Sequence, residues 1–241
     1  MLAGGPYALQ IVQPGFRSQV ISNVFLKASQ PVSLALTMLP DVVAVGTRRA
    51  DRSSADAVAP VDVIDMRELA LTAPRTDNTQ LLNYMVLSFN SNRENSADGA
   101  DHVDGFSLRG LGVDQVLVLV NGRRRHSSAL INLLGSRGLG SSPTDLNTIA
   151  ANAVDRVEIL RDGAAAQYGS DAIAGVMNFA LKSDNHGGNV LLNNGLHSSG
   201  FGYNPGLSLN KGLKLGQGGF LNLTGEVDQR GFTTTLPTPA T

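Results

Sequence analysis

Residues 154–182 read VDRVEILRDGAAAQYGSDAIAGVMNFALK, and this stretch decides the fold. Residues 154–160 are rich in branched apolar side chains and predict a β-strand. Asp162 then precedes a short alanine-rich helical turn that ends at Gly169. Residues 176–182 predict a second strand, with alternate apolar residues on one side. Short strands joined by a helical turn indicate an α+β unit.

The same mixture of elements continues towards the N-terminus. Residues 115–121 read QVLVLVN, a continuous apolar run typical of a strand that is buried on both faces. The dipeptide Asn121-Gly122 closes this run with a tight turn. Residues 90–104 are rich in Asn, Ser, Asp and Gly and predict an exposed loop. The other elements expected here are strands at 61–64 and 106–109 and helices at 77–87 and 145–153.

Beyond Gly187 the pattern becomes that of longer strands separated by turns, at 189–196, 205–211 and 219–230. This period-2 pattern gives a sheet one apolar and one polar face. A membrane sheet with lipid outside and water inside requires it, and so does a soluble hairpin with one buried face. The last strand alternates most clearly, in the order Leu221, Asn222, Leu223, Thr224, Gly225, Glu226, Val227 and Asp228.

Composition excludes several kinds of site. The chain has 241 residues, a net charge of −1 and no cysteine, which excludes disulfides, thiolate zinc sites and a cysteine nucleophile. The near-neutral charge argues against a nucleic-acid partner. No two of the four histidines have metal-ligand spacing on one helix, so we expect no metal and no cofactor. No apolar run reaches the roughly 18 residues of a transmembrane helix.

Four sequence blocks follow one another in a fixed order. They are FSLRGLG at 106–112, VLVLVNG at 116–122, DRVEILR at 155–161 and QYGSDAIAGVMN at 167–178. Together they resemble the plug domain of TonB-dependent outer-membrane receptors, and the resemblance extends over roughly residues 41–230. It implies an α+β fold, in which a small mixed-sheet plug domain precedes the first antiparallel strands of a transmembrane β-barrel.

The resemblance also implies a division of the chain. We expect a possible TonB-box-like segment and linker at 41–54, the plug domain at 55–182 and an incomplete β-barrel start at 187–241. Residues 1–40 stay unassigned, because their apolar run VSLALTML fits either a signal-peptide remnant or an uninformative N-terminus. Receptors of this family resemble barrels of about 22 strands with a plugged lumen. Residues 182–241 suffice for about three strands, so the chain looks like a fragment or a truncated reading frame.

Two arginines are candidates for locking the plug to the barrel. By resemblance, Arg109 and Arg161 form the plug's half of a charged cluster with glutamates of the barrel wall, and Glu158 belongs to the same candidate group. Arginine suits this role because its planar fork pairs with carboxylates through two nitrogens. The alternative is a surface arginine, or a local pair with Glu158 or Asp162.

The segment before the plug is the candidate for coupling to an energy source. An extended peptide rich in β-branched residues could add a strand to the sheet of a periplasmic partner. By resemblance this segment is the TonB box, and the alternative is the first strand of the plug itself. The candidate residues are Asp41, Val42, Val43, Ala44 and Val45.

By resemblance, the loops at 90–101 and 126–144 face outward and contact the solute. The arginine run beside the Asn-Gly turn could attract an anion, and the alternative is a solvated turn. Glycines at strand ends are expected to serve ordinary turns. The ligand-loop candidates are Asn92, Arg93, Asn95, Arg123, Arg124, Arg125 and His126, and the turn glycines are Gly110, Gly112, Gly122, Gly169 and Gly175.

The resemblance implies a receptor part for energy-coupled uptake of a scarce solute, such as a siderophore, vitamin, sugar or peptide. Its implied partners are a TonB-type energy-coupling protein, the remaining β-barrel, the small-molecule solute and the outer membrane. Two alternatives stay open: a stand-alone periplasmic plug-like binding module and a non-functional receptor fragment. We do not expect an enzyme, because the chain has neither a phosphate-binding Gly-Lys-Ser/Thr loop nor a G-x-S-x-G nucleophile turn.

Overall fold

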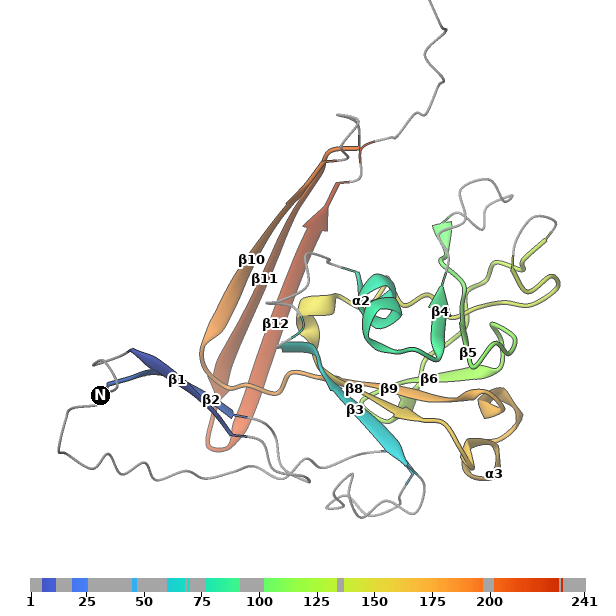
Figure 1. Ribbon diagram of the computed structural model, residues 1–241, viewed down its shortest axis with the longest axis horizontal. Helices are drawn as coiled ribbons and strands as arrows, with labels where there is room; N and C mark the ends of the chain where they lie inside the picture. The colour runs from blue at the N-terminus through green and yellow to red at the C-terminus, as the bar shows by residue number, and fades with distance from the viewer. Residues whose placement is uncertain are drawn as a thin grey trace, which may run out of the picture.

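A five-stranded mixed sheet forms the centre of the molecule (Figure 1). The computed structural model describes residues 6–11, 19–25, 45–46, 60–67, 69, 77–91, 102–133, 137–196, 202–229 and 231. The strands of the sheet follow the order β3-β8-β9-β6-β7. Their bounds are Val61–Asp65 (β3), Val116–Val120 (β6), Arg123–Arg124 (β7), Val154–Leu160 (β8) and Gly175–Leu181 (β9).

Neighbouring strands of this sheet are antiparallel except β6 and β9, which run parallel. The helix α3 (Ala164–Tyr168) and the 3-10 turn η4 (Ser170–Ala172) connect β8 to β9. The parallel partner β6 comes earlier in the chain, so the sheet combines strands that are distant in sequence. The mixed α+β sheet expected from the sequence is confirmed, and β3, β6, β8 and β9 end within one residue of prediction, whereas β7 was not predicted.

The core lies on both faces of the sheet. On one face, the helix α2 (Asn78–Met85) and the hairpin of β4 (Phe89–Ser91) and β5 (Phe106–Leu108) cover the buried side chains Met177 and Phe179. On the other face lies a smaller cluster that includes Ala164 of α3. Alternate residues of β6 enter the two clusters, which explains why its apolar run is continuous.

The predicted helix at 77–87 is confirmed as α2, and its start has a clear cause. The Asp77 carboxylate accepts a hydrogen bond of 2.7 Å from the backbone N–H of Gln80, which caps the helix. Leu81 and Leu82 are buried in the larger core cluster. Among the described residues, no helix is both long and apolar enough to cross a membrane.

The elements from β3 to β9 form the plug-like part of the molecule. A three-stranded antiparallel sheet follows it in the chain and lies beside it (Figure 1). Its strands are β10 (Gly188–Gly195), β11 (Asn204–Leu215) and β12 (Gly219–Asp228). The register aligns Leu192 with Leu207 and Leu207 with Val227 on one face. The apolar side chains of that face are exposed, and they are Val190, Leu192, Leu207, Leu209, Leu213, Leu221, Leu223 and Val227.

The opposite face of this three-stranded sheet is polar and points towards the plug-like part. Ser208 and Asn210 of β11 are buried there. Asn189 of β10 donates a hydrogen bond of 3.0 Å to the side-chain oxygen of Asn152. The alternation expected for 219–230 is therefore confirmed. The face that packs against protein is the polar one, so this sheet is not a soluble hairpin with a buried apolar face.

The helix predicted at 145–153 is wrong. The structure has only a 3-10 turn, η3 (Ala151–Ala153). The Asp145 side chain accepts from the backbone N–H of Asn147 at 2.9 Å, and the Thr148 hydroxyl donates to the Asp145 carbonyl at 2.8 Å. These local bonds give the backbone an alternative to the helix.

Three smaller expectations also need correction. The loop predicted at 90–104 begins with strand residues of β4 and ends at Asp104, which is buried and accepts a hydrogen bond from Asn147. Gly163, with φ of +69°, rather than Asp162, precedes the helix α3. The unassigned N-terminal segment contains an antiparallel hairpin of β1 (Tyr7–Ile11) and β2 (Gln19–Val24).

Candidate functional site

The candidate coupling segment, Asp41 to Val45, reaches the plug core at its last residue. Val45 is fully buried in the smaller core cluster, together with Leu160 and Val176. The backbone N–H of Gly46 donates a hydrogen bond of 3.3 Å to the hydroxyl of Tyr168. The other candidates, Asp41 to Ala44, lie outside the described residues. Whatever displaces this segment must therefore extract a buried valine, which costs about 1.5–3 kcal/mol of apolar burial.

The structure brings Arg109 and Arg161 together. The Nη1 atom of Arg109 donates to the backbone carbonyl of Arg161 at 2.7 Å and pairs with Asp162 at 3.1 Å. The guanidinium of Arg161 pairs with Asp62 of β3. Both side chains are more than 40% exposed, at 42% and 43%. Arg109 thus makes the local pair with Asp162 that the sequence offers as the alternative, and the half-exposed group of two arginines and two aspartates carries no net formal charge.

Arg109 reaches this position through a strained turn. Its φ of +59° lies in the left-handed region, which non-glycine residues adopt at a cost of about 1–3 kcal/mol. The next residue, Gly110, has φ of +75°. The backbone N–H of Arg109 is fixed by a 2.7 Å bond to the Ser88 carbonyl. This left-handed backbone conformation directs the guanidinium of Arg109 towards Arg161, the residue that follows β8.

Glu158 has a different environment from the arginine pair. Its side chain is fully buried and lies 2.9 Å from Arg156, two residues earlier on the same face of β8. Its second oxygen accepts from Asn178 at 3.1 Å. The other end of Asn178 accepts a 2.8 Å bond from the backbone of Gly122. Through these contacts Glu158 supports the Asn-Gly turn from inside the sheet.

The arginine run follows that turn. Asn121 and Gly122 have φ of +49° and +76°, as a tight hairpin turn between β6 and β7 requires. Arg124 pairs with Asp171 at 2.6 Å and also donates to the Tyr168 carbonyl. Arg125 donates to Thr148 at 3.1 Å, whereas Arg123 and His126 are exposed. In this run, Arg124 and Arg125 have protein partners, and Arg124 is nevertheless exposed, as Arg123 and His126 are.

Of the other ligand-loop candidates, Asn92, Arg93 and Asn95 lie outside the described residues. The second loop is anchored by Arg137, which donates to Asn90 of β4 at 3.0 Å. The buried side chain of Asn132 fixes the same loop, by a 2.6 Å bond to the carbonyl of Arg137. The loop that includes 126–133 and 137–144 is therefore attached to the β4–β5 hairpin.

The predicted turn glycines differ in what their positions require. Gly175 has φ of +139°, and a Cβ there would lie 2.7 Å from the carbonyl oxygen of Leu160. Gly112 has no left-handed φ, but a Cβ there would lie 2.7 Å from a carboxylate oxygen of Asp114. The remaining three have left-handed φ values and are Gly110, Gly122 and Gly169.

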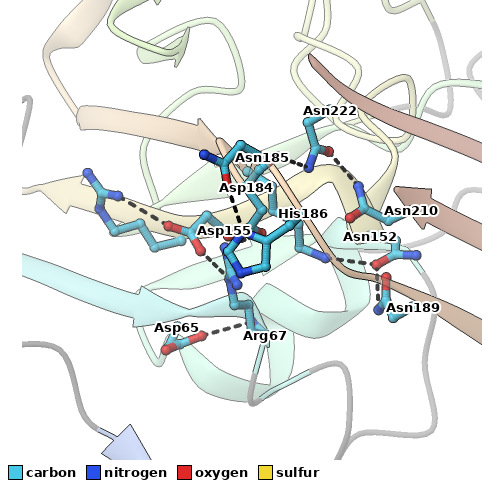
Figure 2. A network of polar contacts seen from close by, with 12 residues as sticks. Asp65, Arg67, Asn152, Asp155, Asp184, Asn185, His186, Asn189, Asn210 and Asn222 are labelled. Atoms are coloured by element: carbon cyan, nitrogen blue, oxygen red, sulfur yellow. Dashed lines mark hydrogen bonds and ion pairs between the residues drawn. The ribbon is translucent and has the colours of Figure 1, made fainter. Parts of the chain in front are cut away.

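A second polar cluster lies between the plug-like part and the three-stranded sheet (Figure 2). Arg67 pairs with Asp155 and, at 2.7 Å, with Asp184. Lys182 donates to the side-chain oxygen of Asn152 at 2.9 Å. Sequence patterns do not indicate this cluster, because its members are separated by up to 117 residues and only Asp155 belongs to one of the four sequence blocks.

The charges in this cluster affect one another. Burial, followed by the positive charge of Arg67, lowers the pKa of Lys182 below its usual value. Burial also disfavours the charge on Arg67, but the carboxylates of Asp155 and Asp184 outweigh it and raise its pKa. Arg67 therefore stays charged at all physiological pH values.

Comparison with known proteins places this fold. A family model described as the TonB-dependent receptor plug domain matches residues 53–176. The vitamin B12 transporter BtuB of Vibrio cholerae serotype O1 is 27% identical over 193 residues, which cover 80% of this chain and 28% of that protein. The ferric enterobactin receptor of Pseudomonas aeruginosa is 31% identical over 130 residues, which cover 53% of this chain and 17% of that protein.

Solved structures agree with these relatives. The siderophore receptor PirA from Acinetobacter baumannii is 25% identical, with a TM-score of 0.53, and the match covers 70% of this chain and 24% of that chain. A variant of the ferric enterobactin receptor PfeA from Pseudomonas aeruginosa is 25% identical, with a TM-score of 0.55 over 72% of this chain and 25% of that chain. The chain thus spans less than a third of the length of these relatives, and it belongs to the family of TonB-dependent receptor plug domains.

Proposed function

We propose that this chain forms the plug and the first barrel strands of an outer-membrane receptor that takes up a scarce small solute. The coupling segment and its linker are at 41–54, the plug at 55–182 and the barrel start at 187–241. The observation that carries the proposal is the three-stranded sheet, whose polar face packs towards the plug while its apolar face is exposed. A barrel wall needs this arrangement, because lipid covers its outer face and a wet lumen its inner face.

The two ends of the molecule support an assignment of sides. The turn between β11 and β12 is short, at 216–218, and short turns are typical of the periplasmic side of such barrels. In Figure 1, the end of β4 and the start of β5 point to the same side as the end of β10, opposite to this turn. The loop anchored by Arg137 is attached to that hairpin, so it contributes to the outward, solute-binding surface.

The relatives support a choice of solute class. These relatives are named as a vitamin B12 transporter, a ferric enterobactin receptor and a siderophore receptor. Ferric siderophores and cobalamin are therefore the first solutes to test, before sugars and peptides.

The exposed arginine pair of Arg109 and Arg161 locks the plug to glutamates of the barrel wall. Glu158 acts within the sheet, through the Asn-Gly turn that precedes the arginine run.

The coupling step uses the segment that ends at Val45. A TonB-type protein adds the segment to its own sheet and pulls, and the buried valine transmits the movement to the plug. Val43→Pro removes a strand donor, so it should weaken binding of the partner's C-terminal domain at least tenfold. Binding is measured on the full chain in detergent micelles, with Ala50→Pro in the linker as the matched control.

In a receptor that contains this chain, Val43→Pro should abolish energy-coupled uptake and leave solute binding intact. Equal partner binding by Val43→Pro and the parent chain would show that 41–45 is the first strand of the plug instead. Loss of binding in both proline variants would place the contact in the linker.

A further inference from the structure

Arg67 connects three parts of the chain that are distant in sequence (Figure 2). It lies two residues beyond the end of β3. Its backbone N–H donates a hydrogen bond of 2.8 Å to the side chain of Asp65, the last residue of that strand. Its Nε atom pairs with Asp155 of β8. Its Nη2 atom pairs with Asp184 at 2.7 Å, in the connector at 182–187 that leads from β9 to β10.

The connector is held on its other side by the three-stranded sheet. The side chain of Asn222 on β12 donates to the Asp184 carbonyl at 3.4 Å, and the backbone N–H of Gly212 on β11 donates to Gly187 at 3.2 Å. A Cβ at position 212 would lie 2.5 Å from the Asp184 carbonyl oxygen. Asp184 thus faces Arg67 with its side chain and the sheet with its backbone.

The order of elements along the chain gives Arg67 its significance. Among the described strands, β3 is an edge strand that pairs only with β8. It is also the first strand of the central sheet that follows the coupling segment in the sequence, so a pull along the backbone reaches β3 first, whereas Val45 itself packs against Leu160 and Val176. Arg67 lies two residues beyond the end of β3, and its two carboxylate partners tie this end of the strand to β8 and to the connector.

We infer that Arg67 is a clamp that joins β3 to the connector between plug and barrel, so that the two are released together. It is a positioning residue, since it contacts neither the solute-facing loops nor the coupling segment among the described residues. Its use during transport rests on the proposed function, whereas the clamp itself is a property of this chain. It is distinct from the pair of Arg109 and Arg161, which lies at the end of β8 that Leu160 closes.

The chemistry of the clamp requires arginine. The guanidinium presents Nε and Nη2 to two carboxylates at once, in a fixed plane. A lysine at position 67 offers one ammonium on a flexible stem, which can pair with Asp155 or Asp184 but does not hold both in one geometry. Arg67→Lys should therefore retain part of the effect, and Arg67→Gln should lose it.

Amide hydrogen exchange on the full 241-residue chain in detergent micelles tests this inference. In Arg67→Gln, exchange of the amides in β3 and in 182–187 should accelerate by a common factor of about ten or more, since a lost charge-assisted bond is worth roughly that. The amides of β6 should keep their rates, because the core does not depend on the clamp. Arg123→Gln removes the same charge at an exposed position and should change neither segment.

Asp184→Asn separates the two sides of the clamp. It should accelerate exchange in the connector while β3, still held through Asp155, changes less. Acceleration in β3 alone after Arg67→Gln, no acceleration in either segment, or equal acceleration in β6 would overturn the inference. The experiment uses neither solute nor partner protein, so its failure is separate from a failure of the proposed function.

Discussion

Lys182 lies beside Arg67, and its titration reports on that neighbour. Burial and the charge of Arg67 lower the pKa of Lys182 from the usual 10.5, while Asp184 and Asp155 act in the opposite direction. In Arg67→Gln the pKa of Lys182 should therefore rise, since one lowering cause is removed and both carboxylates remain. NMR of a ¹³C-methylated lysine titrated against pH measures this, with Arg123→Gln as the control.

The sign of the matching stability change follows from proton linkage. Between the lowered pKa and 10.5, the unfolded chain binds more protons at Lys182 than the folded chain does. Stability should therefore rise with pH across this window and be lowest below the lowered pKa. The rise should shrink in Arg67→Gln. A pKa of Lys182 that stays fixed in that variant would contradict the electrostatic effect of Arg67 on Lys182.

Gly175 is the glycine whose replacement should cost most. Its φ of +139° is unfavourable for any other residue, and a Cβ would meet Leu160 backbone at 2.7 Å and Leu108 at 2.8 Å. Gly175→Ala should lower the free energy of unfolding by about 2 kcal/mol or more. Denaturant unfolding in micelles measures the loss. Gly225→Ala, where a Cβ meets nothing within 4 Å, should change it by less than about 0.5 kcal/mol.

The central sheet shows how far sequence patterns predict elements. The continuous apolar run of β6 predicted burial on both faces, and its alternate residues do enter two clusters. The period-2 pattern of β12 likewise predicted its two faces. The helix expected at 145–153 failed because Asp145 and Thr148 bond to nearby backbone, a competition that apolar spacing does not register.

The candidate site was only partly predictable, for a different reason. Arg109 and Arg161 belong to sequence blocks of the family, and the structure brings them together. Asp155 begins the block at 155–161, but Arg67 and Asp184 belong to no block, and only the tertiary arrangement makes the three neighbours. Glu158 lies in the same sequence block as Arg161 and is therefore grouped with the arginine pair by sequence. Strand alternation instead places its buried side chain on the same face of β8 as Arg156.

At the scale of the sheet of β10 to β12, the exposed apolar face predicts self-association in water. Leucine and valine side chains of all three strands share that face, and β12 pairs only with β11 among the described strands, so its other edge offers backbone groups for pairing. Without detergent, the chain should form oligomers in light scattering. Replacing Leu209 and Leu223 by Asn should reduce them. A monomer with slow amide exchange in β12 would contradict this.

On the scale of the whole molecule, the two parts bury opposite kinds of side chain. The plug-like part has an apolar core on both faces of its sheet, whereas the three-stranded sheet turns its polar face inward and leaves its apolar face uncovered. The interface between them is built from amides, charges and backbone carbonyls, including Asn152, Asn189 and Asp184. A receptor that moves its plug against the barrel needs such a polar interface, because it can be rehydrated.

The most direct test of this account is a spin-label scan along β12. The chain has no cysteine, so single cysteines from Leu221 to Asp228 need no background substitutions. In detergent micelles, labels at 221, 223, 225 and 227 should be accessible to oxygen in the apolar phase. Labels at 222, 224, 226 and 228 should be shielded by the plug or accessible to a water-soluble reagent. Loss of this alternation, or its reversal, would contradict the assignment of a plug beside a barrel wall.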